Sequence, residues 1–70
     1  MSASPSIAHG TPEALREFVQ ECLHMTAFYA GMGVDYAAVG DDAGLRYSTR
    51  CAAAAMRQAL SVMKMLEGQS

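Results

Sequence analysis

The stretch LREFVQECLHMTAFYAGMGVDYAAV, Leu15 to Val39, decides the fold of this chain. Its apolar residues recur at alternating intervals of three and four, which places them along one side of a helix. A seam of this kind that continues over several heptads is typical of a helix that packs lengthwise on another helix. The seam consists of Leu15, Phe18, Cys22, Met25, Tyr29, Met32, Tyr36 and Val39.

Two glycines, Gly31 and Gly33, lie on either side of the seam residue Met32. The alternating intervals of three and four residues continue unchanged past them. Each glycine costs a helix interior about 0.8–1 kcal/mol relative to alanine, so a compensating gain is expected. We predict that the glycines let two helix backbones approach closely, beside an alanine run in the second half of the chain. In this interpretation Tyr29 and Tyr36 fill the space above that run. The residues assigned to close helix packing are Gly31, Gly33, Ala52 and Ala55.

Capping and turn signals divide the chain into two helices. Thr11 can cap a helix whose first residue is Pro12, which predicts a first helix over about residues 12–39. Glycines and aspartates from Gly40 to Gly44 predict a turn over about residues 40–44. A second helix then covers about residues 45–67 and ends before Gly68. Residues 1–10 are predicted to be a flexible tail, and residues 11–68 a single helical-hairpin domain.

A short turn between two helices predicts an all-α fold, an antiparallel two-helix hairpin. With the turn centred between Asp41 and Asp42, facing residues should have numbers that sum to about 83. A chain of 70 residues forms only a marginal core. We therefore expect dimerisation or a partner helix to complete the hairpin to a four-helix bundle. The residues predicted to form this partner or oligomer interface are Phe18, Met25, Tyr29, Met32, Tyr36, Met56, Leu60 and Met63.

Charged residues are distributed unevenly between the two predicted helices. The first carries an acidic row at four-residue spacing, Glu13, Glu17 and Glu21. The second carries a basic row, Arg46, Arg50, Arg57 and Lys64. The rows are either two solvated surfaces or a charge match that sets the register or the partner. A weak membrane-surface module that uses the basic row is a further alternative. The net charge of −2 argues against a nucleic-acid partner.

No residue pattern indicates catalysis, and the sequence predicts neither an enzyme nor a cofactor. Cys22 and His24 stand two residues apart, so on a helix they point to nearly opposite sides. The register places Cys22 and Cys51 about 15 Å apart along the hairpin, too far for an intrachain disulfide. A small metal-binding or thiol redox bundle that uses Cys22, His24 and Cys51 remains the alternative to an interaction protein.

The layout of helix, turn and helix with an apolar groove is similar to that of the small helical-hairpin chaperones that hold needle subunits in type III secretion. This resemblance implies a protein that binds other proteins, either copies of itself or an amphipathic partner helix. The start of the chain lacks the charged and apolar regions of a signal peptide, and two unpaired thiols suit a reducing compartment, so the sequence predicts a cytoplasmic protein.

Overall fold

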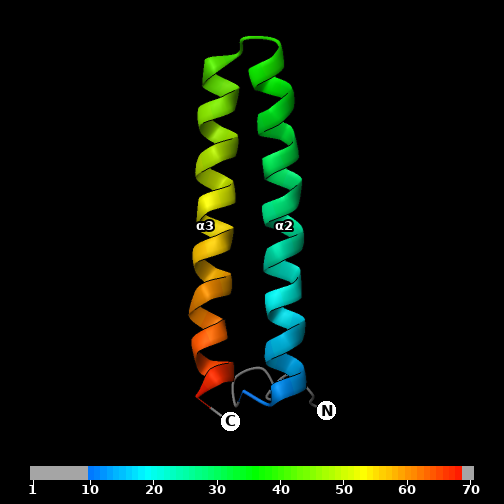
Figure 1. Ribbon diagram of the computed structural model, residues 1–70, viewed down its shortest axis with the longest axis vertical. Coiled ribbons are helices and arrows are strands. Elements are labelled where there is room, and N and C mark those ends of the chain that lie inside the picture. Colours follow the sequence, from blue (N-terminus) through cyan, green and yellow to red (C-terminus); the bar gives the residue numbers. More distant parts are fainter. Residues whose placement is uncertain (1–9, 69–70) are drawn as a thin grey trace, which may run out of the picture.

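The computed structural model describes residues 10–68, and its two helices lie side by side in an antiparallel hairpin (Figure 1). The helix α2 spans Pro12–Ala38 and the helix α3 spans Asp42–Glu67. No strand occurs within the described residues, so the predicted all-α hairpin is confirmed. The tail predicted for residues 1–10 lies, apart from Gly10, outside the described residues.

Local hydrogen bonds fix both ends of α2. At its start the Thr11 hydroxyl accepts the Ala14 N–H at 3.2 Å, and Pro12 occupies the first turn, which confirms the predicted cap. At its end Gly40 takes a φ of 74°, a conformation that favours glycine. The Gly40 N–H then donates to the Ala37 carbonyl and the Asp41 N–H to the Tyr36 carbonyl, at 3.1 and 2.9 Å. These two bonds form a Schellman motif that reverses the chain.

The helix α3 begins at Asp42, three residues before the predicted start. The cause is Asp41, whose carboxylate accepts the Gly44 N–H at 3.0 Å and so caps the helix at once. Gly44 therefore belongs to the first turn of α3 and not to the connection. The shorter turn also changes the register. Gly33 faces Ser48, so facing positions sum to 33 plus 48, or 81, and not to the predicted 83.

The two helices meet along a line of mostly small residues. Val19, Cys22 and Ala59 form the core cluster, against which Phe18, Val62 and Met63 pack. The buried residues of the described chain are, besides Gly10, Ala14, Leu15, Val19, Cys22, Gly33, Ser48 and Ala59. Because these side chains are small, the core between the helices is thin.

This contact line differs from the predicted seam at several positions. Met25 is 45% exposed and Val39 is 78% exposed, so neither lies between the helices. Thr26 is half-buried instead, and its hydroxyl donates to the Cys22 carbonyl at 2.8 Å. Residues that repeat every seven positions shift gradually around a straight helix, which has 3.6 residues per turn. The predicted seam therefore diverges from the line along which α2 contacts α3. Along the actual line, Val19 and Gly33 are buried more deeply than their seam neighbours Phe18 and Met32.

The glycines that permit close contact are Gly33 and Gly44, and the assignment of Gly31 was wrong for the hairpin. A Cβ built on Gly33 would lie 3.5 Å from the Ser48 Cβ, whereas one on Gly31 would meet no atom within 4 Å. A Cβ on Gly44 would lie 2.6 Å from Cγ and Cε1 of Tyr36. The ring of Tyr36 therefore occupies the space beside Gly44 and does not lie above Ala52 to Ala55.

We expect Gly44→Ala to destabilise the hairpin by about 1–3 kcal/mol, because the new methyl group forces the Tyr36 ring out of its place. Gly31→Ala is the matched control. It adds a methyl group in open space and should stabilise the hairpin by up to about 1 kcal/mol through helix propensity. Urea unfolding followed by circular dichroism measures both changes. Equal stabilisation by both alanines would contradict the placement of Tyr36 against Gly44.

Candidate interaction surface

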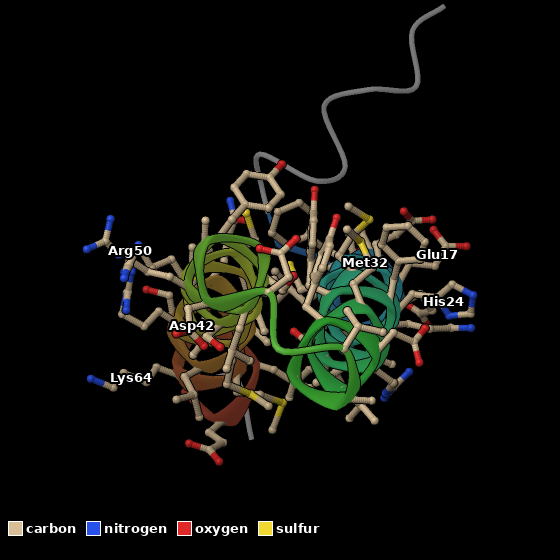
Figure 2. The ribbon with its side chains drawn as sticks, turned by 90° about the horizontal axis from the view of Figure 1, so that it is seen from above. Glu17, His24, Met32, Asp42, Arg50 and Lys64 are labelled. Carbon is tan, nitrogen blue, oxygen red and sulfur yellow. The ribbon has the colours of Figure 1, made fainter. Side chains whose placement is uncertain are left out.

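One side of the hairpin carries a continuous aromatic and methionine surface, here called the aromatic face: Met25, Phe28, Tyr29, Met32 and Tyr47. The Phe28 and Tyr29 rings meet edge to face with centroids 5.4 Å apart. Tyr29 meets Tyr47 of α3 in the same manner at 6.2 Å, so the ring contacts cross from one helix to the other. Figure 2 shows Met32 on the same side of the hairpin as the aromatic rings.

The aromatic face is largely open to solvent. Phe28 is 60% exposed and Tyr47 is 55% exposed, and Met25 is almost half exposed. Phe28 and Tyr47 are not among the residues predicted from sequence to form the interface, and Phe28 does not lie on the seam. A usable signal was present, since Met25, Phe28 and Met32 stand at i, i+3 and i+7, the spacing of one side of a helix. A contiguous exposed patch of this kind marks a surface for binding.

A second exposed set, the aliphatic face, lies on the opposite side: Leu23, Val34, Met56 and Leu60. Val34 stands nine residues after Met25, and Met56 stands nine after Tyr47. Nine residues are about two and a half turns at roughly 3.6 residues per turn, so each pair points in opposite directions. The predicted single interface is therefore split between two faces. Met56 and Leu60 lie across the hairpin from Met25, while Met63 packs on the core cluster.

A shallow groove crosses between the helices beside the aliphatic face. Val34 and Ala37 line it from α2, and Leu45, Thr49 and Ala52 line it from α3. The aromatic side has a second shallow hollow on α3, whose lining includes Tyr47, Cys51, Ala54, Arg46 and Arg50. The groove beside the aliphatic face is lined mainly by apolar side chains and is suited to apolar groups, whereas the lining of the hollow on the aromatic side also includes two arginines, a tyrosine hydroxyl and a thiol.

The acidic and basic rows lie on opposite outer edges of the hairpin. Figure 2 shows Glu17 and His24 on the side of α2 that points away from α3, and Arg50 and Lys64 on the side of α3 that points away from α2. All four side chains are exposed. Because the two rows point away from each other, they do not pair within one hairpin. Charge matching between the rows requires a second molecule.

The groups with chemical potential do not converge on a reaction site. Cys22 is a buried free thiol, whereas His24 on the same helix is exposed. Ser48 is fully buried, and its hydroxyl donates to the Gly44 carbonyl at 2.8 Å within its own helix. Among residues 10–68, no group of three or more histidine, cysteine, aspartate or glutamate side chains is arranged to hold a metal ion.

Cys51 is a half-buried free thiol beside Tyr47. Cys51 raises the pKa of Tyr47, first through the interaction of its side chain with the Tyr47 hydroxyl and second because a thiolate at Cys51 would repel a phenolate. Tyr29 adds to this effect. A tyrosine with its ordinary pKa near 10 is already protonated at neutral pH, and the upward shift keeps Tyr47 so; it presents a neutral ring and hydroxyl on the aromatic face.

Neither described helix has the combination of length and apolarity that a membrane span requires. Comparison with protein-family models, with curated proteins and with solved structures finds no match to this chain. The features of the hairpin that bear on its function are its two apolar faces and its charged edges.

Proposed function

We propose that this chain is a non-enzymatic interaction protein whose hairpin pairs with a second copy to form a four-helix bundle. The observation that carries the proposal is the aromatic face, which exposes Phe28 and Tyr47 beside a core cluster of only three buried residues, Val19, Cys22 and Ala59. Covering these rings supplies apolar burial that the hairpin lacks. Each fully buried aromatic side chain contributes about 1.5–3 kcal/mol relative to an exposed one.

The size of the chain supports the same proposal. Domains of fewer than about 70–80 residues obtain only a few kcal/mol from a single core and usually need a staple, a metal or oligomerisation. Here both cysteines are free thiols, so no disulfide ties the described residues together. A second copy provides the missing apolar contacts. Free thiols are also usual in a reducing compartment, so we propose a cytoplasmic location.

The second candidate function is that of a small chaperone or adaptor that binds an amphipathic helix of another protein. The groove lined by Val34, Leu45 and Ala52 favours it, because apolar side chains at helical spacing fit such a groove. The adaptable thioether of Met56 nearby suits a surface that accepts different side chains. In this case the aliphatic face, and not the aromatic face, carries the function.

Native mass spectrometry combined with sedimentation over a range of concentrations tests the proposal. We expect a species of twice the chain mass of 7.4 kDa, without bound metal, that dissociates on dilution. A stably folded monomer at every concentration would reject self-association and favour the partner-helix candidate. A stoichiometric metal ion in the purified protein would reject the proposal in favour of a metal-binding bundle.

A further inference from the structure

We propose that two hairpins pack aromatic face on aromatic face with their turns at the same end, so that α2 of each copy lies against α3 of the other. This inference rests on the proposed self-association and specifies its geometry. Face-to-face packing of two identical hairpins allows two symmetric arrangements. A two-fold axis along the helices brings the turns together, and an axis across the helices places them at opposite ends.

The charged edges distinguish these arrangements. Two acids of α2 border the aromatic face. Glu17 precedes Phe28 by eleven residues, about three helical turns, and Asp35 follows it by seven residues, about two turns, so both point in nearly the same direction as Phe28. Arg50 and Arg57 flank Ala54 at four and three residues and border the same face on α3. With the turns together, each acidic edge meets a basic edge. With the turns opposed, α2 meets α2 and α3 meets α3, so like charges meet along both edges.

The register of the hairpin extends this match to particular levels. An axis along the helices leaves every residue at its own height, so α2 and the α3 of the second copy keep the sum of 81 set by Gly33 and Ser48. Glu17 is then level with Lys64 of the second copy, since 17 plus 64 is 81. Asp35 is level with Arg46, since 35 plus 46 is also 81. Two opposite-charge pairs, each present twice, therefore fall at matching heights along the edges.

The volumes of the side chains favour the same arrangement. On the aromatic face α2 contributes the large side chains Met25, Phe28 and Met32, whereas α3 contributes Tyr47 and, beside it, the hollow over Cys51 and Ala54. Phe28 is level with position 53 of the second copy and so faces this hollow. Large side chains then pack over small ones. In the opposed arrangement the large side chains of α2 meet each other, and the α3 helices are left apart.

Charge reversal tests the inference through the sign of its effect. With the turns together, Glu17→Lys or Lys64→Glu alone should raise the dimer Kd about three- to tenfold, because each replaces two attractive pairs with repulsive ones. The combined variant Glu17→Lys/Lys64→Glu should return the Kd to nearly its original value. With the turns opposed, each single change removes a like-charge contact and should lower the Kd. Either a lower Kd or no change in all three variants would overturn the proposed geometry.

A distance measurement between the turns provides an independent test. A spin label at Val39→Cys, in a Cys22→Ala/Cys51→Ser background that retains its helical circular dichroism, reports the separation of the turns because Val39 is 78% exposed. With the turns together, the distance is set by the interhelical spacing of about 10 Å plus the label arms. With the turns opposed, it reaches the helix length of about 40 Å. A long distance in a dimer overturns the geometry alone, whereas a monomeric mass overturns the self-association.

Discussion

Replacing Phe28 with aspartate is expected to dissociate the dimer and to leave the hairpin helical. Phe28 is 60% exposed in the single hairpin, so the substitution removes little from the hairpin itself. In the proposed dimer its ring enters the hollow over Ala54, and an unpaired carboxylate cannot be buried there without a large cost. Loss of a central aromatic anchor commonly costs 2 kcal/mol or more, so the dimer Kd should rise at least about thirtyfold. Sedimentation velocity at a series of concentrations measures this change.

Leu60→Asp is the matched control for this experiment. Leu60 is 57% exposed and lies in the interior of a helix, so the two variants expose a new carboxylate in similar surroundings. It belongs to the aliphatic face, which the proposed dimer leaves open. We expect the dimer Kd of the Leu60→Asp variant to stay within about threefold of the original value. If Leu60→Asp dissociates the dimer and Phe28→Asp does not, the two copies meet through the aliphatic face and the assignment is reversed.

The parts of the fold that could be predicted from sequence are those fixed by local hydrogen bonds. Thr11 and Pro12 determine the start of α2, and the glycine at position 40 allows its end. These residues act on backbone groups within a few positions of themselves, so the sequence contains the whole interaction. The hairpin follows because so short a turn places the two helices antiparallel and adjacent, where parts of their apolar surfaces cover each other.

The register and the glycine contact could not be predicted, because they depend on small differences between alternatives that look equivalent in sequence. Either Asp41 or Asp42 can cap a helix, and the choice of Asp41 brings Gly44 into α3 and moves the register by two residues. Similarly, Gly31 and Gly33 differ by two positions in one seam. Only the actual crossing of the helices places Gly33 against Ser48 and leaves Gly31 in solvent.

The candidate site was predicted only in part for a related reason. Periodicity identifies apolar residues that share a broad side of a helix, but a hairpin in a larger bundle has two sides from which a further neighbour can approach. Met32 and Met56 therefore appeared equivalent in sequence. The ring contacts from Phe28 through Tyr29 to Tyr47 define one of the two sides as continuous across both helices. That continuity arises from tertiary packing and has no counterpart in the spacing of either helix alone.

Leu15→Ala is expected to reduce the free energy of unfolding by about 2–4 kcal/mol, enough to unfold much of the protein at room temperature. Leu15 is 2% exposed, the least among the large apolar side chains of α2, and its loss leaves a cavity beside a core made of small residues. Urea unfolding at one fixed protein concentration measures the change.

The control for this deletion is Leu23→Ala, eight residues later in the same helix. Leu23 is 45% exposed on the aliphatic face, and alanine has at least the same helix propensity, so the expected loss is below about 1 kcal/mol. The difference between the two variants isolates the burial of Leu15 from any effect on the helix alone. If both leucines cost the same, the aliphatic face is covered in solution, and the thin core between α2 and α3 is not the main source of stability. If only Leu15→Ala greatly lowers the free energy of unfolding, the hairpin owes its stability mainly to the contacts between α2 and α3.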